Sequence, residues 1–273
     1  MNTDLRVADT HYAFGTNWKD YVRKLDEAAI EQATLDFSAL VPEECVRGKD
    51  VIDIGSGSGL HSLAALRLGA RSLLALDIDR DSVEATASTL AKFAPGSDYR
   101  VIEKSILDHD AADLGQFDLV YSWGVLHHTG AMWDAIDAAS KRVKPGGVFA
   151  LAIYRRTPLC WLWRIEKRIF TNAGETTRRV IRAIFTGAYQ VGLLATGRSP
   201  QGYIEDYKKV RGMNWYNDVD DWLGGYPYES ATEAQIERFL QKRGFTAQYI
   251  NPAKRKLGVF GTGCAEFRFQ RIE

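Results

Sequence analysis

Apolar runs alternate with stretches of helical periodicity between residues 50 and 154. Short runs rich in Val, Ile and Leu predict buried strands, and apolar positions three and four apart predict the helices that cover them. This alternation predicts a parallel sheet covered on both faces. The predicted strands are residues 50–55, 72–78, 99–106, 117–123 and 148–154, and the predicted helices are residues 59–70, 81–94 and 133–143.

The alternation stops after residue 154 and resumes at Ser230. Ser230 and Glu233 have the spacing of a capping box that opens a helix, and Gly244 is placed to end it. Two last strands are expected at residues 246–250 and 265–271, and their close connection favours an antiparallel pair. We therefore predict an α/β fold, a Rossmann-like, doubly wound sheet of seven strands, its last strand antiparallel, with a helical cap inserted after strand five.

Composition narrows the class of protein. The formal net charge is zero, with 35 basic and 35 acidic residues, which argues against a dedicated nucleic-acid binder. Cys45, Cys160 and Cys264 lack the spacing of a metal or disulfide framework, which favours a reducing compartment. No apolar leader and no apolar run of about 20 residues is found, so we predict a cytoplasmic protein without a transmembrane segment. The oligomeric state stays open.

Three glycines follow the first strand in "VIDIGSGSGL", at Gly55, Gly57 and Gly59. Glycine allows a positive φ and a close approach of a ligand to the backbone. The dinucleotide pattern G-x-G-x-x-G is not met because Leu60 holds its sixth position, and the Lys-Ser/Thr pair of a phosphate loop is missing. Asp53 would repel a pyrophosphate and suits a cationic ammonium group.

The second strand ends in Asp77, followed by Ile78. An acid at that place can accept hydrogen bonds from both hydroxyls of a ribose, and Ile78 can lie on an adenine face. A ligand with a ribose, an adenine, a positively charged tail and no phosphate fits these features. S-adenosyl-L-methionine is such a ligand.

Four segments then carry a resemblance to a known family. "VIDIGSGSGL", "LALDID", "FDLVYSWGVLHHT" and "VKPGGVFALAIY" resemble, in order and spacing, the motifs of class I S-adenosylmethionine-dependent methyltransferases. The resemblance is strong over residues 45–154 and loose over residues 230–273. The ends of the chain, "FGTNWKDY" and "NWYNDVDDWLGGYPYE", are similar to a bacterial subgroup that modifies glycans or small metabolites.

The resemblance implies a set of cofactor contacts. Many relatives carry an acid where this chain has Ser105, so Asp108 is an alternative partner for the adenine amino group. The implied cofactor-binding residues, Gly59 of the glycine loop included, are Asp53, Gly55, Gly57, Gly59, Asp77, Ile78, Ser105, Ile106 and Trp123.

Methyl transfer to a hydroxyl needs an aligned acceptor and a group that removes a proton. His127 and His128 follow the fourth strand, where the methyl group is expected, and we favour His128 as the base. An orienting role for both histidines is the alternative. Trp222, Tyr226 and Tyr154 are the predicted acceptor-binding residues.

Three parts are expected in the chain. An amphipathic helix is predicted over residues 19–40. The boundaries are residues 1–44 for a helical and aromatic segment that covers the cofactor site, 45–154 and 230–273 for the methyltransferase core, and 155–229 for an inserted cap that selects the acceptor.

The predicted cap is basic. Residues 155–212 contain twelve lysines and arginines against four acids, an excess of eight positive charges in a neutral chain. The simplest explanation is a pair of helices with aromatics inside and solvated arginines outside. The alternatives are an anionic or glycan acceptor, or a membrane surface that carries a lipid-linked one. Asp218, Asp220 and Asp221 allow a divalent metal but lack the pattern of a calcium loop, so we predict no metal site.

The leading hypothesis is O-methylation of a saccharide or another small-molecule hydroxyl. The alternatives are a quinol or phenol O-methyltransferase, an RNA methyltransferase, and a non-catalytic S-adenosylmethionine-binding protein. RNA is disfavoured because "YSWGVL" stands where an Asn/Asp-Pro-Pro-Tyr tetrad would be expected.

Overall fold

The computed structural model describes residues 18, 21–23, 25–211, 215–252 and 259–272. Seven strands form one sheet in the order β3-β2-β1-β4-β5-β7-β6. β1 to β5 are parallel, and β7 is antiparallel to both β5 and β6. The strands are β1 Asp50–Ile54, β2 Ser72–Asp77, β3 Tyr99–Glu103, β4 Phe117–Trp123, β5 Val143–Tyr154, β6 Phe245–Asn251 and β7 Cys264–Arg271.

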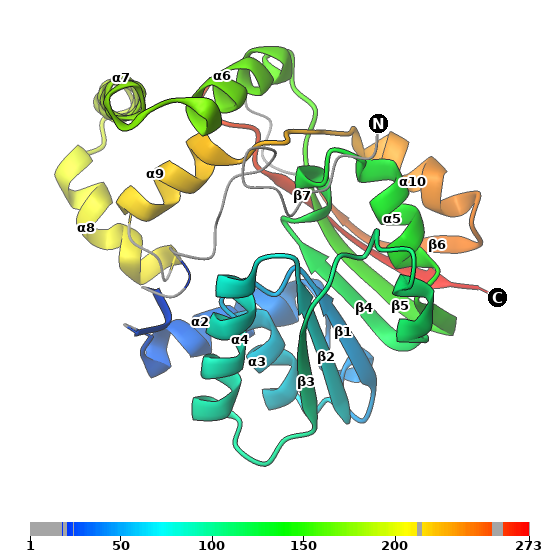
Figure 1. Cartoon of the computed structure of the whole chain (residues 1–273). Helices are drawn as coiled ribbons and strands as arrows, with labels where there is room; N and C mark the ends of the chain where they lie inside the picture. The colour runs from blue at the N-terminus through cyan, green and yellow to red at the C-terminus, as the bar shows by residue number, and fades with distance from the viewer. Residues whose placement is uncertain (1–17, 19–20, 24, 212–214, 253–258, 273) are drawn as a thin grey trace.

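Helices cover both faces of this sheet (Figure 1). One buried cluster joins the sheet to α2, α3 and α4, and a second joins the opposite face to α5 and α10. Neighbouring residues of β1 enter different clusters, since Val51 faces the first and Ile52 the second. The helices are α2 Glu27–Leu40, α3 Leu60–Arg67, α4 Arg80–Phe93, α5 Met132–Ser140 and α10 Glu233–Gln241. The predicted doubly wound sheet of seven strands is thus confirmed.

Four helices stand between β5 and α10, in the segment predicted as the cap. They are α6 Cys160–Asn172, α7 Glu175–Ala195, α8 Pro200–Arg211 and α9 Trp215–Gly224. Their inner faces meet in a third buried cluster that includes Phe170, Phe185, Trp215 and Leu223. Figure 1 shows α6 to α9 as a group at one end of the molecule, and α8 packs against α2.

Two predicted helices differ in the structure. The helix expected over residues 19–40 is interrupted: residues 18 and 21–23 are helical, Leu25 and Asp26 are not, and α2 begins at Glu27, where Asp26 caps it by accepting a hydrogen bond from the backbone N–H of Ala29 (2.9 Å). Its expected first turns include residues 19, 20 and 24, which lie outside the described residues.

The capping box of α10 is Thr232 with Gln235, not Ser230 with Glu233. The reason is that Ala231 still pairs with Arg155 in a parallel bridge, so the chain stays extended two residues longer than its sequence suggests. The carbonyl of Ser230 accepts a hydrogen bond from Arg156 within this extended stretch.

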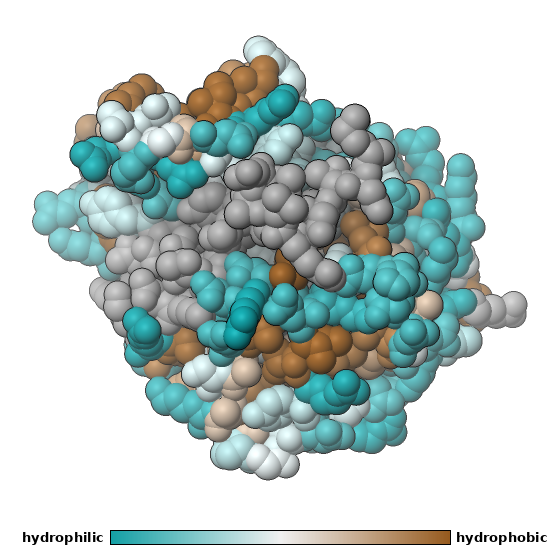
Figure 2. Space-filling model, viewed as in Figure 1, coloured by the Kyte–Doolittle hydropathy of each residue, from teal (hydrophilic) through white to brown (hydrophobic). Residues whose placement is uncertain are grey.

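Exposed apolar side chains gather on α6 and α7, where Figure 2 shows two hydrophobic areas at the top of the molecule. Within the described part of the chain, no helix combines the length and the apolar character that crossing a membrane requires.

Candidate active site

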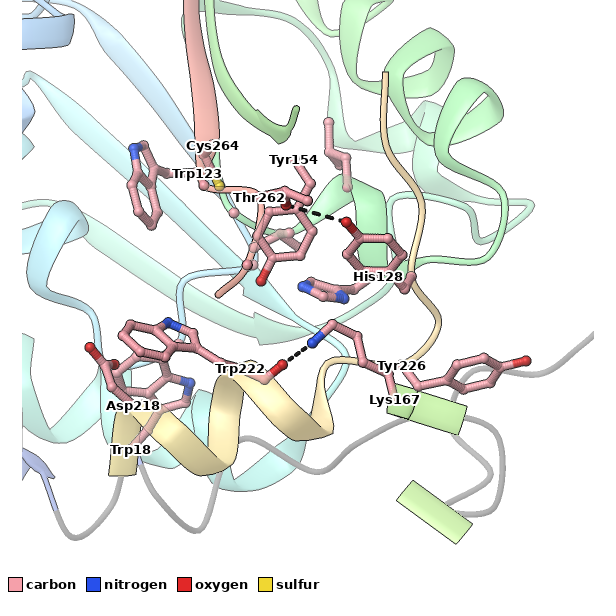
Figure 3. Close-up of a pocket in the computed structure, with 18 of the residues that line it drawn as sticks. Trp18, Trp123, His128, Tyr154, Lys167, Asp218, Trp222, Tyr226, Thr262 and Cys264 are labelled. Atoms are coloured by element: carbon pink, nitrogen blue, oxygen red, sulfur yellow. Dashed lines mark hydrogen bonds between the residues drawn. The ribbon is translucent and has the colours of Figure 1, made fainter. Parts of the chain in front are cut away.

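A cavity of about 1110 Å³ lies between the carboxyl ends of the strands and the cap helices (Figure 3). The core contributes the ends of β1, β2, β4 and β5, with Ile54, Asp77, Trp123 and Tyr154 in the wall. The carboxyl ends of parallel strands are where doubly wound sheets bind ligands. The fold therefore opens its main cavity at the place predicted for the cofactor.

The glycine loop forms the floor of this cavity. Gly55 and Gly57 both have positive φ, +79° and +55°, a region that favours glycine. A Cβ on Gly55 would stand 2.4 Å from the Val125 side chain, and a Cβ on Gly57 would stand 3.2 Å from the indole nitrogen of Trp18. Both glycines line the cavity, and their missing side chains let Val125 and Trp18 pack closely against the backbone of the loop.

Gly59 and Asp53 are placed differently from the predicted ligand contacts. Neither lines the cavity. A Cβ on Gly59 would stand 2.9 Å from the Thr86 backbone, so this glycine lets α4 pack closely on the loop. Asp53 is 3% exposed, accepts a hydrogen bond from Ser62 (2.6 Å), and has its pKa raised to about 7 by burial. It supports the loop from below.

Asp77 ends β2 with its carboxylate in the cavity wall. It accepts hydrogen bonds from the backbone N–H groups of Gly57 and Asp79, both at 3.0 Å. Burial raises the pKa of Asp77 to about 6, against the opposing effect of these two hydrogen bonds. The carboxylate thus ties the glycine loop to β2, and Ile78 beside it also lines the cavity.

The other predicted cofactor residues also lie in the wall. Ser105, Ile106 and Trp123 all line the cavity, and Trp123 donates from its indole nitrogen to Glu266 (3.0 Å). Asp108, the alternative to Ser105, does not line it. Its carboxylate accepts from the backbone N–H of Ser105 (3.0 Å) and so shapes the loop after β3.

The two histidines after β4 point into different environments. His128 lines the cavity and its Nδ1 lies 2.8 Å from the carbonyl oxygen of Pro227. Because a carbonyl only accepts, Nδ1 of a neutral His128 carries the proton. Burial lowers the pKa of His128 to about 4, so the ring is neutral at pH 7.

His127 is fully buried and does not line the cavity. Its Nδ1 accepts from the backbone N–H of Tyr154 (3.3 Å), and its ring packs on that of Tyr154 with centroids 3.9 Å apart. Burial lowers the pKa of His127 well below its ordinary value. It therefore holds the end of β5 and the ring of Tyr154 in place.

The cap side of the cavity is aromatic. Trp222, Tyr226 and Tyr154, the predicted acceptor residues, all line it, although Figure 3 shows the Tyr226 ring extending away from His128. The further aromatic lining residues on the cap and the segment after it are Trp163, Phe185, Tyr189, Tyr203, Tyr207 and Tyr228.

Lys167 brings a charge into this aromatic wall. It is 5% exposed, and its Nζ lies 5.6 Å from the ring centroids of both Trp163 and Tyr228. Nζ also donates to the carbonyl of Trp222, towards which Figure 3 shows it turned. Burial lowers the pKa of Lys167, whose charge in turn lowers the pKa of His128.

The acidic side chains described on α9 each bind a different side chain of the cap. Asp218 accepts from the hydroxyl of Tyr207, and Asp220 forms an ion pair with Arg182 (2.6 Å). The side chain of Asp221 lies outside the described residues. Among the described residues, no group of three or more His, Cys, Asp and Glu side chains could hold a metal ion.

Three lining residues were missed or misassigned from the sequence. Lys167 looked like one more solvated charge of a basic helix, and Trp18 belongs to "FGTNWKDY", which predicted no contact for it. His61 follows the glycine loop without a predicted role in the site, and it lines the cavity and lies 3.2 Å, through Nδ1, from the hydroxyl of Tyr121. The signal for the burial of Lys167 was its helical spacing in "WLWRIEKRIF": it lies four residues after Trp163 and three before Phe170, on the same side of the helix.

Comparisons with known proteins agree with this geometry. Residues 52–149 match a family described as "Methyltransferase domain". The ubiquinone biosynthesis O-methyltransferase of Xanthomonas campestris pv. campestris is 33% identical over 130 residues, 48% of this chain and 52% of that protein. The chain spans about half the length of the curated relatives it matches.

Solved structures share the fold. Magnesium protoporphyrin IX methyltransferase from Synechocystis PCC 6803 with bound SAH has a TM-score of 0.55 at 14% identity, covering 94% of this chain and 96% of that one. The N-methyltransferase NodS from Bradyrhizobium japonicum, in complex with S-adenosyl-L-homocysteine, has a TM-score of 0.53 at 14% identity, covering 96% and 100%. The sheet order, the glycine loop and the match over residues 52–149 together identify the core of this chain as a class I S-adenosylmethionine-dependent methyltransferase domain.

Proposed function

We propose that this methyltransferase methylates the hydroxyl of a phenol- or quinol-type acceptor. The observation that carries the proposal is the wall of aromatic side chains around Lys167 and His128. Aromatic rings bind flat, apolar partners, and a buried ammonium group favours an acceptor that can become an anion. The name of the Xanthomonas relative, an O-methyltransferase of ubiquinone biosynthesis, supports the same class.

The core residues fit the cofactor. Gly55 and Gly57 line the cavity, Asp77 presents a carboxylate able to accept from two ribose hydroxyls, and Ile78 offers an apolar face to the adenine. S-adenosylmethionine supplies, when bound, an electrophilic methyl group on a positively charged sulfur. Asp53 would act through the loop rather than by contact, since Ser62 occupies its carboxylate.

His128 is the residue that we propose takes the proton of the acceptor. Its pKa of about 4 keeps it unprotonated at pH 7 and also makes it a weak base. A phenol ionises near pH ~10, so full proton transfer to His128 costs about 8 kcal/mol at ~1.36 kcal/mol per unit. An alcohol near the ~15.7 of water costs about 16 kcal/mol, which equals the whole barrier of a reaction at ~10 per second. The site therefore favours an acidic, phenol-type hydroxyl over that of a simple alcohol.

Pairs of acceptors of similar size, one aromatic and one saturated, test this proposal. We expect hydroquinones and catechols to be methylated with a kcat/KM at least about tenfold above that of the corresponding cyclohexanols, because only the aromatic ring acidifies the hydroxyl. Mass spectrometry with isotope-labelled S-adenosylmethionine measures both. Equal rates for the two members of a pair, or a preference for monosaccharides, would return the acceptor to the saccharide hypothesis.

Gly57→Ala tests the floor of the cofactor site. Its Cβ would fill the narrow space below the Trp18 indole, so we expect the Kd for S-adenosylmethionine to rise at least about tenfold. Gly96→Ala is the matched control: Gly96 also has positive φ, +84°, but a Cβ there meets nothing within 4 Å. Calorimetry measures the Kd for S-adenosylmethionine in both variants. Backbone strain is common to the two, whereas only the Gly57 variant fills space beside Trp18. An equal Kd in both would contradict the proposed floor.

A further inference from the structure

We propose that the outer faces of α6 and α7 bind an anionic lipid surface, a role that goes beyond the methyl transfer proposed above. Eight large apolar side chains on these helices are between 45% and 68% exposed. Here they are named the outer cap face. They are Trp161, Leu162, Ile165 and Ile169 of α6 and Val180, Ile184, Val191 and Leu194 of α7.

The spacing gathers these side chains along one stripe of each helix. At about 100° per residue, the four on α6 fall within an arc of roughly 100° and the four on α7 within one of roughly 80°. The opposite side of α6 carries Trp163, Lys167 and Phe170, and that of α7 carries Phe185 and Tyr189, all turned inwards. Each helix is thus apolar on two sides, and the inner side already has its partners.

Positive charge flanks the outer cap face. Arg168 follows one edge of the stripe on α6 and Arg179 follows the stripe on α7, both exposed, whereas Arg164 donates from Nε to the carbonyl of Tyr228 (3.2 Å). The two acids of these helices are withdrawn from that face: Glu166 is partly buried, with carboxylate oxygens that have less than 1 Å² of surface, and Glu175 lies 3.6 Å from Arg182. An apolar stripe with Trp on it and arginines at its edge is the pattern of a helix that lies in the membrane interface.

The charge argues for lipid over a second copy of this chain. A two-fold contact places the same surface on both sides of the interface, so a second copy would bring a second set of arginines to the contact and no acid of the outer cap face to pair with them. An anionic headgroup layer instead pairs with Arg168 and Arg179 while the acyl region takes the apolar stripe. The inner sides of the same helices line the proposed acceptor wall, so docking would bring that wall to a membrane-borne acceptor.

Sedimentation with vesicles tests the inference. We expect the full chain to sediment with phosphatidylcholine vesicles that contain about 30% phosphatidylglycerol and much less with pure phosphatidylcholine. Ile184→Ser with Val191→Ser should lower the partition coefficient about tenfold or more. Arg168→Gln with Arg179→Gln should lower it about fivefold per arginine, with a weaker dependence on salt.

Leu35→Ser with Ile272→Ser is the matched control, because these residues are 61% and 63% exposed but lie on α2 and after β7. The control should sediment like the wild type. The inference is overturned if the wild type stays in the supernatant, if the control loses binding to the same extent, or if analytical ultracentrifugation finds a dimer that the Ile184 and Val191 variant abolishes. Cofactor affinity and turnover of a dissolved phenol should stay unchanged in every variant. These two measurements therefore test the proposed function independently of lipid binding.

Discussion

Replacing His128 by Asn is expected to lower kcat about 100-fold while the Kd for S-adenosylmethionine stays within about twofold. Asn keeps a side-chain N–H near the position of Nδ1, so the hydrogen bond to the Pro227 carbonyl can persist. The variant removes the nitrogen that we propose takes the proton. General bases contribute about 10²- to 10⁴-fold, and the low pKa of His128 places the expected loss at the lower end.

His109→Ala is the control histidine, because His109 is exposed and does not line the cavity. Single-turnover measurements with a phenolic acceptor separate the chemical step from binding. A His128→Asn enzyme with unchanged single-turnover rate would remove His128 from proton transfer. His127 would not inherit the role by default, since it is buried and bonded to the backbone of Tyr154.

The core was predictable because its signals are local. A strand such as β1 is a short apolar run whose alternate residues face two buried clusters, and an acid at its end followed by spaced glycines marks the ligand edge. Gly55, Gly57 and Asp77 could be named from these signals, and all three line the cavity. The ligand-binding edge of the sheet is predictable because the end of a strand and the turn after it are determined by residues that are neighbours in the sequence.

Contacts between distant segments were not predictable in the same way. Asp53 was assigned to the ligand, but the side chain that occupies its carboxylate is Ser62, one turn into the next helix. Lys167 is buried only because α9 packs across α6 and offers the Trp222 carbonyl 55 residues later. Propensity and spacing describe one element at a time, whereas burial of a charge depends on two elements meeting.

Replacing Lys167 by Met is expected to change the pH profile of methylation as well as its rate. We propose that the Lys167 ammonium stabilises the acceptor as an anion, so its loss should lower kcat/KM for phenols about 10- to 100-fold, the ~1.5–3 kcal/mol of a charge-assisted hydrogen bond. Met has nearly the volume of the lysine stem and retains the apolar contact with Trp163.

The two limbs of the profile should respond in opposite ways. The wild type needs Lys167 protonated, so activity falls as the pH rises through a lysine pKa that burial holds below its ordinary value. It also needs His128 unprotonated, so activity falls as the pH drops towards about 4. In Lys167→Met the alkaline limb should disappear, and the acidic limb should move to higher pH, because the lysine charge no longer lowers the pKa of His128.

Two further variants make the expected shift specific to the charge. Lys167→Arg keeps a cation that does not titrate below pH ~12, so it should lose the alkaline limb and keep more activity than Lys167→Met. Lys92→Met removes an exposed lysine that also lies over a ring, 4.6 Å from the Phe93 centroid, and should change nothing. A purely structural role for Lys167 predicts a lower rate with both limbs in place. In that case Lys167 would only hold α9 through its hydrogen bond to the Trp222 carbonyl, without changing the ionisation of His128 or of the acceptor. The aromatic wall alone would then account for the choice of acceptor.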